Sequence, residues 1–324
     1  MNNIELKDQL NRINKVIPKG SRVYYFDYPV YGNVGDMLIW KGTEQFLKNS
    51  KIRVIKRISY HLVEYLIKKS ELHIPRDTII LCQGGGNFGD LYMEHQNLRK
   101  LLVKNFPEHK IVILPQTIYY NDLKGMVKDF EIFSKHKNLH LYVRDQISYK
   151  QVSPYLKNVY LSQDMAHAMY PIIENKKTKY STLYFFRKDI EKVEVDYNDD
   201  QIDYSHMFDW DNLLSNLDNK IIDIFNNLHN SYKVHKYFPA NLLSKLWYYY
   251  TGFKIRQAIN LFSNYDEIVT SRLHGHILAC LMDKKNKVLD NSYGKNSGYF
   301  NCWTNKVKGA KLIYDRKDYS TKGQ

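Results

Sequence analysis

The sequence predicts an α/β protein with two Rossmann-like, doubly wound domains that face each other across a cleft. Short apolar segments rich in β-branched and aromatic residues alternate with longer amphipathic segments along the 324 residues. This alternation is typical of parallel sheets whose strands are joined by helices. The pattern breaks near Tyr170 and Pro171. We therefore expect an N-terminal domain over 1–170 and a C-terminal domain over 171–324.

The first half is expected to begin with an amphipathic helix over 4–17. Strands and helices then alternate, with strands expected at 22–26, 52–57, 78–82, 110–114 and 140–143, and helices at 37–48, 61–69 and from 91 to 106. In a doubly wound sheet, ligands bind beyond the carboxyl ends of the strands. Each of these ends carries glycine or a polar residue, which predicts a single ligand-binding rim.

The second half repeats the alternation. Strands are expected at 181–186, 266–269 and 287–289, helices at 213–228 and 277–282, and a solvated acidic insertion at 191–203. The segment 241–256 mixes aromatic residues with lysine and arginine. That mixture suits a core helix with a few exposed cations or a segment at a membrane surface, and the sequence leaves both open.

Composition restricts the classes of partner. The formal charge of +14 suits nucleic acid, an anionic membrane or anionic small substrates. Scattered lysines and the lack of any RNA-binding or zinc-finger signature argue against nucleic acid. Three distant cysteines indicate a reducing compartment, and no histidine or carboxylate cluster has metal-ligand spacing. Without an apolar run near the roughly 18 residues that cross a bilayer, we expect a cytoplasmic protein with no metal.

The word Gly-Asn-x-Gly-Asp occurs twice, at 32–36 and 86–90, each time after an expected strand. Glycine permits tight turns, while asparagine and aspartate cap helices or bind hydroxyl groups. Both copies are therefore candidates for ligand binding or for a purely structural turn and cap. The glycines at 84–86 lack the spacing of a phosphate loop or a dinucleotide fingerprint, so no nucleotide cofactor is indicated.

Cationic and titratable side chains follow other expected strands. The segment 270–276, Thr-Ser-Arg-Leu-His-Gly-His, places one arginine and two histidines at a strand-to-helix turn. Such a turn can hold an anionic substrate and protonate it. Arg144 and Arg187 each follow an apolar strand and are either further ligands or domain-edge cations. We interpret Asp164 and His167 as core or interface residues.

Taken together, these motifs resemble the polysaccharide pyruvyl transferase family. The resemblance covers roughly 24–299 and rests on six ordered segments, at 32–36, 84–87, 114–117, 143–145, 186–189 and 271–275. It implies a GT-B-like pair of Rossmann-like halves. It also implies transfer of the enolpyruvyl carbons of phosphoenolpyruvate to two hydroxyls of one sugar, which gives a cyclic ketal. The donor is then a substrate, and no cofactor is expected.

The family's Arg-Leu-His motif falls on Arg272, Leu273 and His274 and implies that they hold phosphoenolpyruvate. The carboxylate and phosphate of this substrate call for at least two cations, so Arg144 and Arg187 are further candidates. The resemblance favours His274 as the general acid that protonates the methylene carbon.

His276 is the alternative acid. The first domain is expected to line the acceptor side with amide and carboxylate groups, which suit sugar hydroxyls. The candidates are Asn33, Asp36, Asn87, Asp90 and Gln116. One of these carboxylates is a candidate general base, and the sequence does not choose between them.

The resemblance implies an acceptor from an exopolysaccharide, capsule or cell-wall polymer precursor, free or lipid-linked. A basic surface with the segment 242–256 would then contact the anionic inner face of the membrane. Two other classes remain open. One is a nucleotide-sugar glycosyltransferase of the same architecture, since fold does not fix function. The other is a non-catalytic scaffold that binds sugars or anions.

Overall fold

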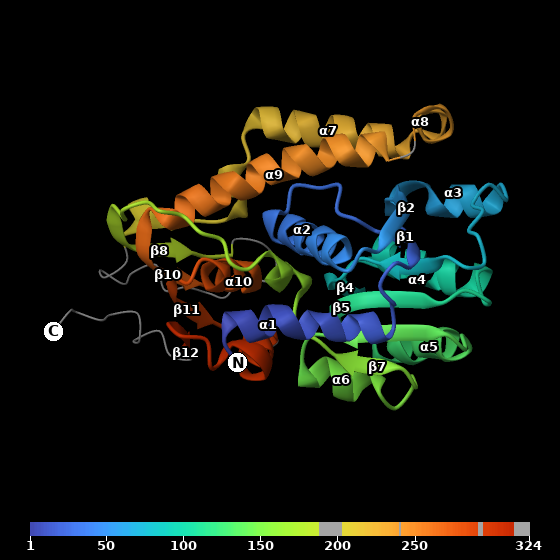
Figure 1. The fold of residues 1–324 in the computed structure, drawn as a ribbon, viewed down its shortest axis with the longest axis horizontal. Helices are drawn as coiled ribbons and strands as arrows, with labels where there is room; N and C mark the ends of the chain where they lie inside the picture. The colour runs from blue at the N-terminus through green and yellow to red at the C-terminus, as the bar shows by residue number, and fades with distance from the viewer. Residues whose placement is uncertain (188–202, 240, 291–293, 314–324) are drawn as a thin grey trace.

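The computed structural model contains two parallel β-sheets, one from each half of the chain (Figure 1). It describes residues 1–187, 203–239, 241–290 and 294–313. The predicted acidic insertion at 191–203 lies almost wholly outside these residues. Every pairing between the described strands is parallel, which confirms the predicted α/β class.

The N-terminal sheet has the strand order β2-β1-β3-β5-β6-β7, with β4 paired to β5. Its strands are β1 (Arg22–Phe26), β2 (Arg53–Ile58), β3 (Ile79–Cys82), β4 (Gly85–Gly89), β5 (Ile111–Tyr119), β6 (Leu139–Val143) and β7 (Val159–Leu161). From β1 the chain adds β2 along one edge of that strand, and β3 then pairs with the opposite edge of β1. The switch point of this doubly wound order lies between β1 and β3.

The C-terminal sheet has the order β12-β11-β10-β8-β9. Its strands are β8 (Tyr180–Phe185), β9 (Met207–Phe208), β10 (Tyr265–Thr270), β11 (Lys285–Leu289) and β12 (Ala310–Ile313). Here the switch point lies between β8 and β10. Each half therefore offers one place where ligands bind in such sheets.

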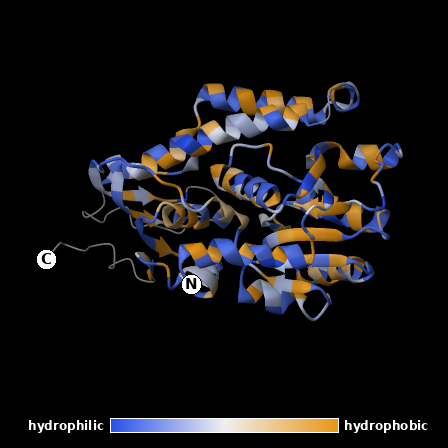
Figure 2. Ribbon diagram, in the orientation of Figure 1, coloured by the Kyte–Doolittle hydropathy of each residue, from blue (hydrophilic) through white to orange (hydrophobic). Residues whose placement is uncertain are grey.

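The helices connect the strands and cover the sheets (Figure 1). They are α1 (Asn3–Gln9), α2 (Val34–Asn49), α3 (Val63–Lys68), α4 (Met93–Asn105), α5 (Leu123–Ser134), α6 (Gln146–Val152), α7 (Asn216–Asn230), α8 (Tyr232–Tyr237), α9 (Leu242–Ser263), α10 (Leu273–Leu281) and α11 (Lys295–Tyr299). A short 3₁₀ helix, η3 (Met165–Met169), follows the N-terminal sheet. Figure 2 shows hydrophobic residues concentrated in the N-terminal sheet and mixed hydropathy along α7 and α9.

One continuous cluster of buried apolar side chains joins the two halves. It includes Tyr25 and Trp40 from the first half and Phe185 and Ile268 from the second. Helix α9 runs alongside α2, although its chain continues into β10 of the other sheet (Figure 1). Its Trp247 is fully buried and donates a hydrogen bond from Nε1 to the carbonyl of Pro29 at 2.5 Å. The second half is thereby packed directly on the first.

Two predicted boundaries in the first half were wrong. Strand β5 does not stop at residue 114 but runs through Pro115 to Tyr119, because its pairing with neighbouring strands shifts register between Ile113 and Gln116. A proline lacks the N–H of a regular ladder, and such an irregularity accommodates it. The second Gly-Asn-x-Gly-Asp segment contributes to strand β4, and α4 begins only at Met93.

The first Gly-Asn-x-Gly-Asp segment does open a helix. Asn33 is the N-cap of α2, and its Oδ1 accepts hydrogen bonds from the backbone N–H groups of Gly35 and Asp36 at 2.9 and 3.4 Å. In the second copy, Gly89 has φ of +130° and a Cβ there would overlap the backbone of Tyr119. The same five-residue motif therefore caps α2 in its first copy and allows close contact between β4 and β5 in its second copy.

Candidate active site

A cavity of about 400 Å³ lies between residues of the two halves. Its N-terminal wall comes from the segments after β1 and β2, from β4 and from the start of α4, and its C-terminal wall comes from segments after β8, β9, β10 and β11. Both switch points thus contribute to one cavity, as expected for ligand sites in doubly wound sheets. Its lining is Tyr31, Asn33, Asp36, Tyr60, Gly86, Asn87, Tyr92, Glu94, His95, Arg187, Trp210, Arg272, Leu273, His274 and Lys295.

Arg272 is held rigidly on the C-terminal wall. It is the N-cap of α10, directly after β10, and is only 7% exposed. Its Nε and Nη2 donate to the two carboxylate oxygens of Asp209, each at 2.7 Å. A bidentate pair of this kind fixes the plane of the guanidinium group. Because Asp209 is fully buried, the pair sets the orientation in which Arg272 meets a ligand.

His274 is positioned by a buried carboxylate. It lies in the first turn of α10, which begins at Leu273, four residues before the predicted start at 277. Its Nε2 is 3.3 Å from Oδ2 of Asp164. The same oxygen accepts a hydrogen bond from Nη1 of Arg144 at 2.5 Å. Burial alone would raise the pKa of Asp164, but the hydrogen bond and charge of His274 and the charge of Arg144 hold it well below its usual range. Asp164 therefore stays ionised beside the ring of His274.

Arg144 does not reach the cavity wall. Its side chain is fully buried, and besides Asp164 it contacts the hydroxyl of Thr117 through Nε and Nη2 at 3.2 and 2.9 Å. It lies directly behind the cavity, since a Cβ added to Gly86 would be 3.4 Å from its Nη2. Arg144 thus supports Asp164 and is not among the residues that line the cavity.

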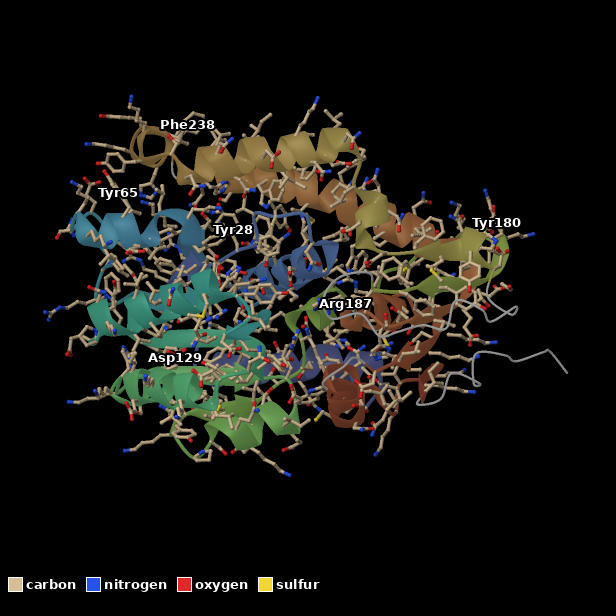
Figure 3. All side chains as sticks on the ribbon, turned by 180° about the vertical axis from the view of Figure 1, so that it is seen from behind. Tyr28, Tyr65, Asp129, Tyr180, Arg187 and Phe238 are labelled. Atoms are coloured by element: carbon tan, nitrogen blue, oxygen red, sulfur yellow. The ribbon has the colours of Figure 1, made fainter. Side chains whose placement is uncertain are left out.

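Two further cations line the cavity with Arg272. Arg187 follows β8, as predicted, and its backbone N–H donates to the hydroxyl of Ser271 at 2.9 Å. Figure 3 places it near the middle of the molecule, between the two sheets. Lys295 was not predicted. It starts α11, and its Nζ would lie 2.6 Å from a Cβ at Gly86, so the glycine leaves room for the ammonium group.

His276 faces away from the cavity. Its ring is fully buried, with Nδ1 2.6 Å from Oδ1 of Asn286 and Nε2 2.8 Å from the hydroxyl of Thr304. Burial lowers the pKa of His276 to about 4. The geometry favours His274 over His276 as an acid at this site.

The predicted acceptor residues divide into two groups. Asn33, Asp36 and Asn87 line the cavity. Asp90 does not, because its Oδ2 accepts the backbone N–H groups of Asn121 and Asp122, each at 2.7 Å. Gln116 is fully buried in β5 and donates from Nε2 to the carbonyl of Gln83 at 2.8 Å. The last two side chains stabilise loops and strands.

The comparisons with known proteins agree with this geometry. Residues 33–293 match the family described as Polysaccharide pyruvyl transferase. The chain belongs to this family. The matched range contains every residue that lines the cavity except Tyr31 and Lys295, and it confirms the resemblance drawn from the six motifs. The protein is therefore a pyruvyltransferase enzyme, and membership of the family implies a polysaccharide sugar as acceptor.

Individual relatives extend over nearly the whole pyruvyl transferase chain. It is 40% identical over 312 residues to "Putative pyruvyl transferase EpsO" of Bacillus subtilis (strain 168), which covers 96% of this chain and 94% of that protein. It is 27% identical over 314 residues to "Pyruvyl transferase 1" of Schizosaccharomyces pombe, over 92% of this chain and 74% of that protein. The crystal structure of an uncharacterized protein from Klebsiella pneumoniae has the same fold, with a TM-score of 0.61 at 20% identity, over 96% of this chain and 99% of that one.

Several residues of the pyruvyl transferase site escaped prediction. Asp209, Lys295 and His95 had no motif of their own, and Tyr31, Tyr60, Tyr92 and Trp210 form an aromatic lining that nothing in the local sequence marks. The described residues contain no group of three or more His, Cys, Asp or Glu placed to hold a metal ion. Within the same residues, no helix is both long and apolar enough to span a bilayer.

Proposed function

We propose that this pyruvyl transferase moves the pyruvyl group of phosphoenolpyruvate onto two hydroxyls of one sugar in a polysaccharide precursor and forms a cyclic ketal. The supporting observation is the concentration of Arg187, Arg272, Lys295 and His274 on one wall of the cavity, opposite amides, two carboxylates and aromatic rings. The cationic wall suits a donor with a carboxylate and a phosphate. The opposite wall suits a sugar, whose hydroxyls need directed hydrogen bonds.

In this proposal the donor lies against Arg272 and Leu273, with Arg187 and Lys295 near its anionic groups. His274 gives its proton to the methylene carbon while the second carbon becomes oxocarbenium-like. Asp164 stays ionised and holds the ring of His274 through Nε2. Arg144 acts through Asp164, because it holds the carboxylate that positions the ring.

The GT-B-like arrangement belongs to the same proposal. The boundary near residue 170 falls between β7 and β8, where the chain passes from one sheet to the other. A cavity with one wall from each half is the site expected of this architecture. Unlike two loosely hinged domains, however, these halves share one apolar cluster.

The function is tested by incubating the protein with phosphoenolpyruvate and a panel of galactose-, glucose- and mannose-type acceptors, free and lipid-linked. Phosphate release together with a pyruvyl gain in the mass of the sugar supports it. Thermal stabilisation by a sugar nucleotide but not by phosphoenolpyruvate would instead support a glycosyltransferase. Binding of sugar or anion without turnover would support a scaffold.

We also propose that the enzyme acts on the cytoplasmic side as a peripheral membrane protein. Leu242, Leu246, Tyr249 and Phe253 are spaced along one face of α9, and their side chains are between 36% and 65% exposed. Lys245 and Arg256 are exposed on the same helix, which contains no acidic residue. An apolar stripe flanked by cations is typical of helices that lie on anionic lipid. Two such cationic faces would repel each other, which disfavours self-pairing.

Replacing Leu246 and Phe253 together by aspartate is expected to abolish sedimentation of the protein with vesicles rich in phosphatidylglycerol. The wild-type protein should bind these vesicles at low salt and dissociate from them as the salt concentration rises, because salt screens the attraction between exposed charges. Leu123→Asp is the matched control, since this leucine is 64% exposed on α5. Equal binding of wild type and double variant, or no wild-type binding at low salt, would contradict the proposal.

A further inference from the structure

A second histidine lines the same cavity from the opposite wall. His95 lies in the first turn of α4, and its side chain is 10% exposed. Its Nδ1 is 2.6 Å from Oδ1 of Asp27, whose side chain is fully buried. Among the described residues, Nε2 of His95 has no hydrogen-bond partner. A neutral imidazole whose Nδ1–H is donated to a carboxylate presents Nε2 as a proton acceptor.

Asp27 is held in an unusual backbone conformation. It directly follows β1 with φ of +69°, in the left-handed region that few residues other than glycine adopt. Its backbone N–H donates to the carbonyl of Ile58 at 2.9 Å, and its Oδ2 is 3.4 Å from Nη2 of the buried Arg99. Strained residues persist where the surrounding structure holds them, and they cluster at functional sites. The backbone conformation of Asp27 and its contact with Arg99 thus hold the carboxylate of Asp27 next to Nδ1 of His95.

Arg99 connects this pair to the predicted acceptor residues. Besides Asp27, it donates to the backbone carbonyl of Asn87 at 3.0 Å and to the side-chain oxygen of the same residue. Asn87 in turn lines the cavity. The network therefore couples the position of His95 to a side chain that can hydrogen-bond a sugar hydroxyl.

Aromatic rings surround His95 on the cavity side. The ring centroids of Tyr60, Tyr31 and Tyr92 lie 4.9, 6.0 and 6.5 Å from that of the histidine. The three rings carry hydroxyl groups beside Nε2 of His95, and the amides and carboxylates of the same wall are those of Asn33, Asp36, Asn87 and Glu94. A sugar ring resting on this wall would bring its hydroxyls to the imidazole, whereas the donor's anionic groups are drawn to the cations of the other wall.

We propose that His95 is the general base that activates the acceptor hydroxyl, with Asp27 as the residue that positions it. The assignment rests on the proposed pyruvyl transfer and deepens it. Asp36 and Glu94 also line the cavity, but an imidazole is intrinsically a stronger base than a carboxylate and is therefore better suited to accept the proton of a hydroxyl. The two histidines then have opposite roles, His274 as acid on the donor wall and His95 as base on the acceptor wall.

The protons balance over one turnover. His274 gives its proton to the methylene carbon, the first sugar hydroxyl forms a bond to the second carbon, and its proton passes to Nε2 of His95. The bond from that carbon to the phosphate oxygen then breaks, and the phosphate leaves with the proton from His95. The second hydroxyl attacks the same carbon and returns a proton to His274. Both imidazoles end in their starting states.

The test compares wild type, His95→Gln and Asp27→Asn in full-length protein. We expect His95→Gln to lower kcat for pyruvyl transfer by about 10²- to 10⁴-fold, with thermal stabilisation by phosphoenolpyruvate unchanged. The pH–rate profile should lose its acidic limb, because activity no longer requires deprotonation of this ring. Asp27→Asn should lower kcat without raising KM for the acceptor and should shift the same limb. His140→Gln, a half-buried histidine outside the cavity, is the control.

A third variant separates chemistry from folding. His95→Ala should regain part of its kcat when imidazole is added, which no structural role predicts. An active wild type with unchanged kcat in His95→Gln would overturn the base assignment alone, as would the absence of imidazole rescue. A wild type that neither binds phosphoenolpyruvate nor transfers pyruvate would overturn both this assignment and the proposed function.

Discussion

His274→Gln is expected to lower kcat for pyruvyl transfer by about 10²- to 10⁴-fold, the usual contribution of a positioned general acid. Glutamine keeps a polar group near Asp164 but has no proton to give at neutral pH. The alkaline limb of the pH–rate profile should disappear, because glutamine has no proton whose loss could limit the rate. Binding of phosphoenolpyruvate should change by only a few fold, because the arginines remain.

The measurement is phosphate release and mass gain of the sugar across a range of pH, with phosphoenolpyruvate binding followed by thermal shift. His73→Gln is the control, because His73 is exposed and lies outside the cavity. A variant that keeps its alkaline limb and most of its kcat would show that another group protonates the donor.

Arg272→Lys is expected to weaken phosphoenolpyruvate binding by about 10- to 150-fold. Lysine keeps the positive charge but cannot reproduce the planar fork that Asp209 holds through two hydrogen bonds of 2.7 Å. The expected factor corresponds to the loss of one or two charge-assisted hydrogen bonds, worth about 1.5–3 kcal/mol. Lysine is preferable to alanine, which would leave the buried carboxylate of Asp209 without its cation.

Calorimetric titration with phosphoenolpyruvate measures this effect directly. Arg256→Lys on the exposed face of α9 is the matched control and should bind as wild type does. Unchanged affinity in Arg272→Lys would place the donor away from Arg272, against Arg187 and Lys295 instead.

The local sequence predicted which strand ends carry chemistry, but not which side chains meet. Arg272 and His274 were predicted because a strand, a turn and a helix follow each other within a few residues. Their partners Asp209 and Asp164 lie 63 and 110 residues away along the chain. No local pattern links residues so far apart, because tertiary packing alone brings them together.

Arg144 and Asp164 illustrate the same limit in opposite ways. Arg144 follows β6 at the predicted rim, yet the side chain turns inward to a buried carboxylate. Asp164 is buried, as its interpretation as an interior residue required, but it also contacts His274 at the edge of the cavity. The spacing of apolar residues predicts which positions of a strand are buried. The direction of a charged side chain depends on neighbours that periodicity does not reveal.

The segment at 242–256 shows why composition left two interpretations open. Trp247 and Ile255 of α9 are buried against the rest of the protein, whereas Tyr249 and Phe253 are more than half exposed. The aromatic residues are divided between two faces. Composition alone could not assign them, since it does not distinguish the sides of a helix.

The apolar interior on either side of β1 fixes the proposed acid and the proposed base relative to each other. His274 lies on α10, which packs into the cluster that joins the two halves, and His95 lies on α4, whose Leu98 and Leu102 pack into a second cluster on the other side of β1. The distance between the two imidazoles is then set when the chain folds, and no large rigid-body closure is needed to bring them into register. Preorganisation of this kind spares each catalytic cycle the entropy of assembling its reactive groups. Because the two halves share buried apolar contacts, thermal unfolding of one half is also expected to destabilise the other.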